Sequence, residues 1–156
     1  MNLSKKIALS VAVGFFSNFA FAQTLQDGVD NADSHKYAKA KEVFTQMIAK
    51  SPTSENYFYL GNAYLTQFEP NFELAQENFN KGLAADKKSN LNKIGLASAK
   101  LGKGDKSGLA EIQNIVKDAR DKDAEVLYRA AEALTLFGGA ANADIAVDYL
   151  NRAVEK

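Results

Sequence analysis

The sequence predicts an all-α protein, a solenoid built from about four antiparallel helix pairs. A motif in which a small or apolar residue precedes a bulky one by four positions recurs about every 35 residues. Between these motifs, apolar residues follow helical spacing and are interrupted by Gly or Pro. The period-two alternation of β-branched and aromatic residues that indicates a strand is nowhere sustained.

The recurring motif is predicted to mark the second helix of each unit. In the third unit it fits less well, because Leu109 is followed four residues later by the polar Gln113. Successive small residues are 35, 34 and 37 residues apart, so the four units occupy about 24–53, 54–88, 89–121 and 123–156. The clear instances of the motif are Ala40 with Phe44, Ala75 with Phe79, and Ala146 with Leu150.

Each unit is predicted to form two helices separated by a helix-breaking residue. Pro70 separates the helices of the second unit, Gly102 and Gly104 those of the third, and Gly138-Gly139 those of the fourth. The first helix of the first unit is the least clear, because three Asp residues leave only a thin apolar stripe. The predicted helices span residues 25–32, 37–48, 57–65, 72–83, 91–101, 109–119, 126–137 and 145–153.

Residues 1–22 have the three parts of a cleavable secretory signal. Two Lys near the start precede an apolar run over 7–16, and Ala20-Phe21-Ala22 supplies the small-x-small cleavage site. We expect cleavage after Ala22, so that the mature chain begins at Gln23 and is periplasmic or secreted. The alternative is an uncleaved anchor, but the run is shorter than the roughly 20 apolar residues that span a bilayer.

The second unit resembles the tetratricopeptide repeat (TPR), in which W-x2-L-G-x2-Y is followed by A-x3-F and then P. The matching residues are Tyr57-x2-Leu60-Gly61-x2-Tyr64 and Ala75-x3-Phe79, and the first unit supplies Ala40-x3-Phe44 with Pro52. Tyr57 replaces the Trp of the pattern, and Lys87 stands where Pro is usual. The resemblance covers about residues 25–156 and is to exported bacterial TPR proteins. It implies a right-handed α-solenoid that binds a protein or peptide partner.

Composition argues against several other kinds of protein. Lys plus Arg and Asp plus Glu each number 19, so the formal net charge is zero and the clustered positive charge of nucleic-acid binding is missing. The chain has no Cys, which excludes disulfides, thiolate metal sites and a Cys nucleophile. Neither a nucleic-acid partner nor a membrane span in the mature chain is expected.

No pattern of residues predicts catalysis, a metal site or a cofactor. His35 is the only His and is interpreted as a solvated turn residue. A calcium site is a weaker interpretation of the acidic cluster than a solvated junction, because basic residues interleave with it and no ligand loop is present. The cluster consists of Asp118, Asp121, Asp123 and Glu125. The alternatives to a non-catalytic scaffold are an enzyme, a tightly bound non-catalytic subunit of an envelope enzyme, and the N-terminal portion of a longer repeat protein.

The resemblance implies that partners bind to the concave face, mainly through the first helix of each pair. The side chains expected there, beside Thr66, Lys100 and Glu132, form a strip of Phe58, Asn62, Asn92, Lys93, Tyr128 and Arg129. Phe58 and Tyr128 are the expected anchors, and the basic residues are expected to favour acidic segments. Only Asn62 and Arg129 match the five-residue clamp with which some family members hold a terminal carboxylate. A generic solvated surface remains the alternative.

The C-terminal helix pair is expected to be incompletely covered. Phe137, Tyr149 and Val154 are predicted to be partly exposed and to promote self-association, because solenoids need a polar outer surface on their terminal units.

Overall fold

The computed structural model describes residues 23–119 and 123–155, and within them the chain forms eight α-helices and one short 3-10 turn. The all-α prediction is therefore confirmed. The predicted signal over 1–22 and Asp121 of the acidic cluster lie outside the described residues. The helices are α1 (Leu25–Asp33), α2 (Tyr37–Lys50), α3 (Ser54–Thr66), α4 (Phe72–Ala85), α5 (Asn90–Gly102), α6 (Ser107–Asp118), α7 (Ala124–Phe137) and α8 (Ala143–Val154), with the 3-10 turn over Ala140–Asn142.

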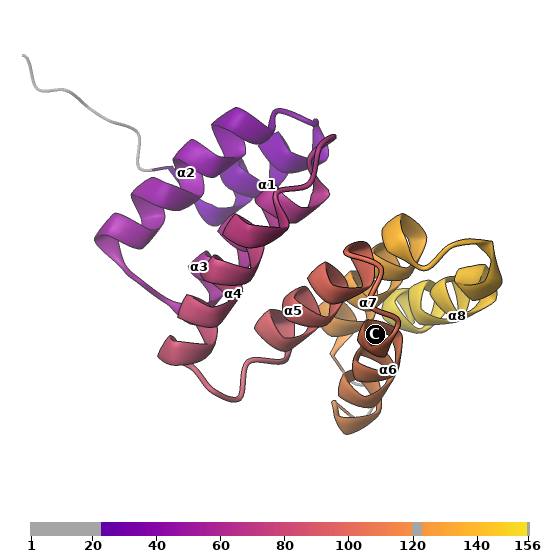
Figure 1. Cartoon of the computed structure of the whole chain (residues 1–156). Helices are drawn as coiled ribbons and strands as arrows, with labels where there is room; N and C mark the ends of the chain where they lie inside the picture. Colours follow the sequence, from indigo (N-terminus) through magenta and orange to yellow (C-terminus); the bar gives the residue numbers. More distant parts are fainter. Residues whose placement is uncertain (1–22, 120–122, 156) are drawn as a thin grey trace, which may run out of the picture.

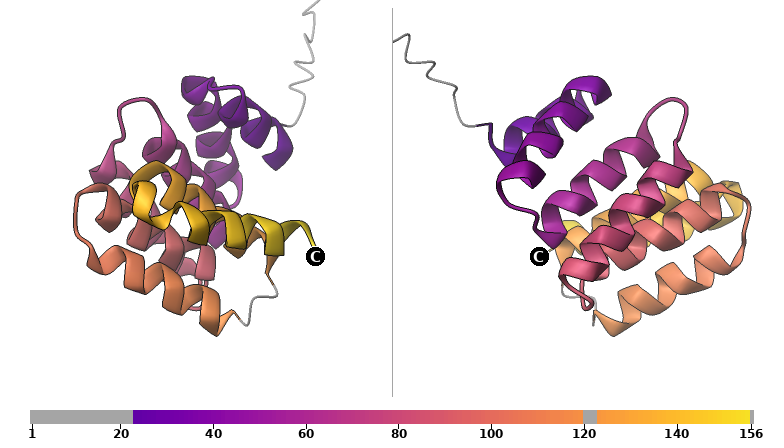
Figure 2. Two further views of the ribbon diagram at one scale, coloured as in Figure 1. Left: turned by 90° about the vertical axis from the view of Figure 1, so that its right-hand side faces the viewer. Right: turned by 60° about the vertical axis from the view of Figure 1, so that its left-hand side comes forward.

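Consecutive helices form four pairs, α1–α2, α3–α4, α5–α6 and α7–α8, and each pair packs against the next. The pairs follow one another across the molecule in the order of the sequence, from indigo to yellow (Figure 1). Figure 2 shows the molecule from two further sides, and in its left panel α8, in yellow, crosses in front of the middle of the molecule. The odd-numbered helices also contact one another, α1 with α3, α3 with α5 and α5 with α7, so they form the inner layer of the solenoid.

The residues of the recurring motif lie at the contacts between helices. Ala40 and Phe44 of α2 and Ala75 and Phe79 of α4 are all buried, as predicted. In the fourth unit Leu150 is exposed and the neighbouring Tyr149 is buried in its place. The motif of the fourth unit is therefore correct only at its small residue.

The motif of the third unit is displaced by one residue from its predicted position. Gly108 and Ile112 of α6 are buried, whereas Leu109 is half-buried and Gln113 is exposed. A Cβ on Gly108 would lie 2.4 Å from the carbonyl oxygen of Ala97, so only glycine allows α6 to approach α5 this closely. The correct pair, Gly108 with Ile112, has the same small-to-bulky spacing as the others.

Most helix N-termini are capped by a side chain that accepts a backbone N–H. Thr24 and Asp27 form a reciprocal capping box at α1, in which the Thr24 hydroxyl accepts from the Asp27 backbone and the Asp27 carboxylate accepts from the Thr24 backbone. The other capping residues are Thr53, Asn71, Ser89 and Asp123.

Two helices of the inner layer end in the same hydrogen-bonded turn. After α5, the N–H of Gly104 donates to Leu101 O and that of Asp105 to Lys100 O, and Gly104 has a φ of +87°. This is the Schellman arrangement, which requires a left-handed residue. After α1, His35 occupies the equivalent position with a φ of +59°, the one positive φ of a non-glycine residue in the described chain.

The C-terminal pair differs in part from its prediction. Val154 is exposed, as expected. Tyr149 is buried among the core residues of α5–α8, so its predicted exposure is wrong, and Phe137 is half-buried with its ring against that of Phe72. Within the described residues, no helix combines the length and apolar character needed to cross a membrane.

Candidate functional site

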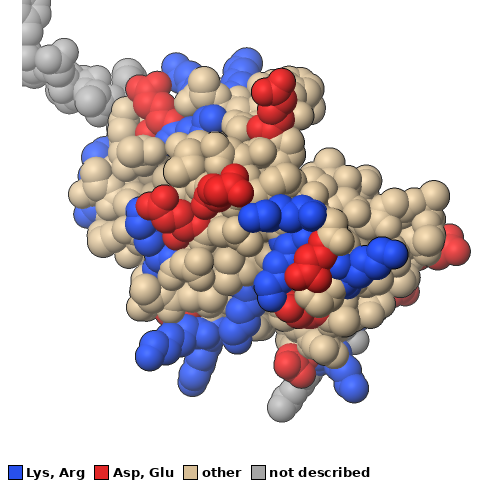
Figure 3. All heavy atoms as spheres, in the orientation of Figure 1, with Lys and Arg blue, Asp and Glu red and all other residues tan. Residues whose placement is uncertain are grey.

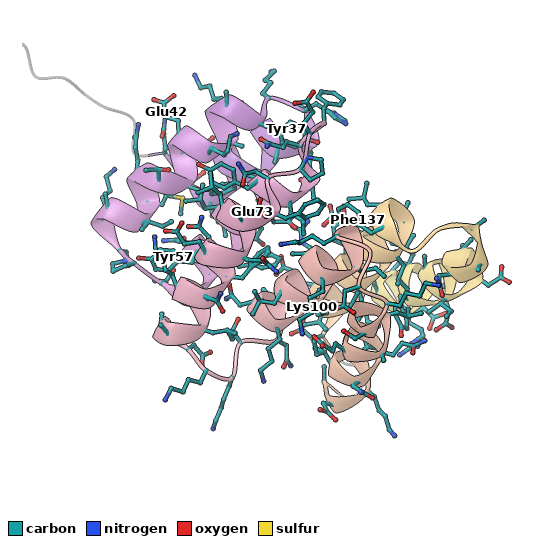
Figure 4. All side chains as sticks on the ribbon, viewed as in Figure 1. Tyr37, Glu42, Tyr57, Glu73, Lys100 and Phe137 are labelled. Carbon is teal, nitrogen blue, oxygen red and sulfur yellow. The ribbon has the colours of Figure 1, made fainter. Side chains whose placement is uncertain are left out.

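A cavity of about 480 Å³ lies on the inner side of the solenoid, between the first three helices and the last two. Part of its wall is apolar, with Val29 and Ala32 from α1 and Leu136 and Leu150 from α7 and α8. Its polar lining consists of Asp33, His35, Tyr37, Tyr59, Asn62, Thr66, Tyr128, Arg129, Glu132 and Thr135. Figure 4 labels Tyr37, which projects from the start of α2.

Two hydrogen bonds join α3 to α7 at the base of this cavity, although the partners are far apart in sequence. The phenol O–H of Tyr59 donates to the carboxylate of Glu125. The side-chain amide of Asn62 donates to Glu132 Oε2 over 3.3 Å. These bonds tie the inner helices of the second and fourth units together.

Arg129 is the central cation of this contact, and its side chain is only 10% exposed. Its guanidinium lies 3.2 Å from Glu132 and 3.7 Å from Glu125. It also lies 4.9 Å from the ring centroid of Tyr128 and 5.5 Å from that of Tyr59. Burial opposes the positive charge, but Glu132, together with Tyr59 and Glu125, raises the pKa of Arg129 above its ordinary value. Arg129 therefore stays protonated, and its positive charge is balanced by the two carboxylates that it contacts.

Burial and nearby carboxylates also raise the pKa of three tyrosines at this site. Burial is the main cause for Tyr59, followed by its hydrogen bond to Glu125. For Tyr37 and Tyr128 burial is again the main cause, and the negative charges of Glu132 and Asp33 add to it, while Thr66 at Tyr37 and Arg129 at Tyr128 act in the opposite direction. Asp33, Tyr37, Tyr128 and Glu132 all line the one cavity.

The structure brings together three of the six predicted site residues: Asn62, Tyr128 and Arg129 all line the cavity. The placement of Phe58 on an open strip is wrong. Its side chain is 1% exposed, and its ring packs 5.2 Å from Tyr59 and 5.9 Å from Phe79. Phe58 is therefore a core residue.

The predicted placement of Asn92 on the strip is also wrong, because this residue is fully buried. Its amide donates to the carbonyl and the hydroxyl of Ser54, at 3.0 and 2.9 Å, and to Ser89 Oγ at 2.9 Å. Asn92 therefore ties the start of α5 to the start of α3.

Lys93 lies in a separate hollow of about 510 Å³, which Lys100 and Glu111 also line. Lys100 Nζ is 2.6 Å from Glu111. Figure 4 labels Lys100, and Figure 3 shows the same face of the molecule. Positive and negative side chains intermingle on this face. The basic residues thus form no continuous strip, and the expected preference for acidic segments has no basis in the cavity.

Several residues that line the cavity were not among the predicted site residues, and they include Asp33, Tyr37 and Tyr59. The carboxylate of Asp33 in the last turn of α1 opposes the helix dipole, but Asp118 at the end of α6 does the same outside the cavity, so this signal does not single out Asp33. Tyr59 carried no comparable signal. In the part of the chain that the structure describes, no three His, Asp or Glu side chains cluster closely enough to hold a metal ion.

A scan of the sequence against protein-family models and a search of the curated proteins find no match. Two solved structures of MamA, a TPR protein, are similar to this chain. "Crystal structure of MamA" has a TM-score of 0.52 at 17% identity and covers 84% of this chain and 74% of that chain. "Crystal structure of MamA protein" has a TM-score of 0.51 at 17% identity, with 84% and 69% covered.

The fold is TPR-like. Identity this low supports a shared architecture of helix pairs and nothing finer. Within this architecture, most of the cavity lining comes from the inner helices α1, α3 and α7.

Proposed function

We propose that this chain is a non-catalytic scaffold that binds a segment of a protein partner in the inner cavity. The observation that carries the proposal is the cavity itself, which combines an apolar wall with convergent polar groups, as binding pockets do. Asn62 and Tyr128 lie at its surface, where an amide and a phenol can hydrogen-bond a peptide backbone. The TPR-like fold supports this reading, because such folds commonly hold protein partners.

A peptide library displayed on phage provides the test. Selected peptides should lose affinity for a Thr135→Phe variant, because Thr135 lines the cavity and a phenyl group would narrow it. They should keep their affinity for Gln113→Phe, which adds the same group to an exposed position on α6. Peptides that bind both variants equally well would show that the cavity is not the binding site.

We further propose that the protein is exported and that its mature form begins at Gln23. Cleavage after Ala22 would leave intact the capping box of Thr24 and Asp27, with which the described fold begins. The intact mass of exported protein tests this proposal, and a mass that includes residues 1–22 would contradict it.

A second contact surface is proposed on α8. Val147, Leu150 and Val154 are exposed apolar residues spaced three and four apart, so they form one stripe along the helix, and this stripe borders the inner cavity at Leu150. Self-association through this stripe should be detectable by analytical ultracentrifugation and weakened by Val154→Asp. A strict monomer over the whole concentration range would refute it.

A further inference from the structure

The accessible charge in the inner cavity is negative. Asp33, Arg129 and Glu132 are its charged lining residues, with His35 the remaining titratable base. The Arg129 side chain is 10% exposed, whereas that of Glu132, the lining carboxylate that pairs with it, is 24% exposed. Asp33 is also exposed. A ligand entering the cavity therefore meets carboxylates more readily than the guanidinium.

Asp33 occupies a position that the fold itself disfavours. It is the last residue of α1, where the aligned peptide dipoles give the helix end a partial negative charge, and that last turn holds no basic residue. A carboxylate here weakens the helix, so local stability does not account for it. Asp118 ends α6 in the same way outside the cavity, so Asp33 is distinguished by its place in the cavity lining and not by its helix position alone.

His35, two residues further on, makes the same turn doubly unfavourable. Its left-handed backbone is disfavoured for any side chain, and the equivalent turn after α5 uses Gly104. The ring of His35 lies 5.8 Å from that of Tyr37, which it meets edge-on. Asp33, His35 and Tyr37 all line the cavity. The α1–α2 turn therefore has an unfavourable backbone conformation and places three side chains in the lining of the cavity.

Tyr37 and Tyr128 add two phenol rings to the lining of the cavity. Both phenols line the cavity together with Asp33 and Glu132, although Asp33 and Tyr37 come from the first unit and Glu132 and Tyr128 from the fourth. Aromatic rings beside carboxylates suit a cationic group, which the ring faces and the negative charges both attract. The apolar wall of Val29, Ala32 and Leu136 suits the aliphatic stem of a long basic side chain.

We infer that the cavity accepts a lysine or arginine side chain from the partner segment, with its charged group among Asp33, Glu132, Tyr37 and Tyr128. This inference rests on the proposed function and specifies the chemistry of the partner. It reverses the preference for acidic segments that the sequence suggested. The clamp of some TPR proteins holds a terminal carboxylate, whereas this cavity is complementary to the opposite charge.

Short capped alanine peptides with one central Lys, Arg, norleucine or Glu are suitable probes, titrated into the purified protein and followed by NMR. The Lys and Arg peptides should shift the backbone signals of Asn62, Tyr128 and Glu132, and the norleucine and Glu peptides should do so much more weakly. Added salt should weaken the binding, because the attraction is partly electrostatic.

Two variants with matched controls test the residues. Asp33→Asn and Glu132→Gln should each weaken binding of the Lys peptide by about two- to fivefold, the range of a partly exposed ion pair. Asp118→Asn, at the last residue of α6, and Glu111→Gln, paired with Lys100 outside the cavity, should leave binding unchanged.

Three outcomes would overturn the inference. If the norleucine or Glu peptides bind in the cavity as tightly as the Lys peptide, the cavity holds a segment but does not select a cation, and the proposed function survives. If no peptide shifts the cavity signals, the cationic preference is wrong, and the phage selection decides the proposed function separately. If Thr135→Phe dissociates a dimer, a second copy of the chain occupies the cavity.

Discussion

The ring of Phe79 lies so close to Gly61 that a Cβ on this glycine would be 2.6 Å from Cε1 of the ring. Gly95 closes the other side, where a Cβ would lie 2.4 Å from the same atom. The two glycines belong to α3 and α5, and Phe79 belongs to α4. The ring therefore fills the space between the first helices of two successive units, and both helices can approach it because they lack a side chain there.

Phe79→Ala should destabilise the protein by about 3–5 kcal/mol. The side chain is completely buried, and its removal leaves a cavity that two rigid helices cannot close. Chemical denaturation followed by circular dichroism measures the loss. A variant as stable as the wild type would mean that this ring does not hold the second and third units together.

Gly61→Ala should cost about 1–3 kcal/mol by overpacking, although alanine is the better helix former. In a Phe79→Leu background the same change should cost clearly less, because the ring that the new methyl group would strike is gone. A double-mutant cycle by urea denaturation gives the coupling between the two sites. Additive effects would show that Gly61 and Phe79 do not constrain each other.

The packing of the second unit could be predicted from the sequence because local spacing encodes it. Ala75 and Phe79 lie one turn apart on one helix, and Gly61 falls at the matching place in the TPR pattern. In the third unit the same spacing was present as Gly108 with Ile112, but Leu109 was taken as the contact residue. Leu109 has the larger apolar side chain, but the close contact between α6 and α5 requires a residue without a side chain, which is Gly108.

The candidate site was harder to predict because it depends on how the solenoid curves. Phe58 was placed on an open face on the assumption that α3 has one buried side, yet α3 packs against α2, α4 and α5 and hydrogen-bonds to α7. Tyr59 and Glu125, which bond to each other, are 66 residues apart. The spacing of residues within one helix carries no information about such a contact.

His35→Gly should stabilise the protein by up to about 1 kcal/mol, because glycine adopts the left-handed conformation without the steric cost that a Cβ imposes. Gly104→Ala, at the equivalent turn after α5, should destabilise it by a similar amount. Thermal unfolding of the two variants makes the comparison. If His35→Gly is instead less stable, the ring contacts of His35 with Tyr37 and Phe68 outweigh the backbone strain.

Asp33→Asn should raise the free energy of unfolding by about 0.3–1 kcal/mol, because it removes a carboxylate from the C-terminal end of α1. Asp118→Asn should act in the same direction at the end of α6. Calorimetry of both variants provides the measurement. A loss of stability in Asp33→Asn would mean that this carboxylate has a structural role, and weaker peptide binding by this variant would no longer indicate direct contact with the ligand.

The free energy of unfolding should fall at alkaline pH because of the ionisation of Tyr59. Burial and the hydrogen bond to Glu125 raise the pKa of this phenol in the folded protein above the ordinary value of 10.0. In the unfolded chain the phenol loses its proton near pH 10, whereas the folded protein retains the proton to higher pH. The contribution of Tyr59 is therefore fully present below pH 10 and is lost as the pH rises beyond it.

Tyr59→Phe should reduce this alkaline loss without abolishing it, because the pKa of Tyr37 and that of Tyr128 are raised as well. At neutral pH the variant should be less stable by about 1–3 kcal/mol, since Glu125 loses a hydrogen bond that joins α3 to α7. Urea denaturation at a series of pH values compares the two proteins. An identical fall in stability above pH 10 would show that the buried phenol of Tyr59 is not a source of the pH dependence.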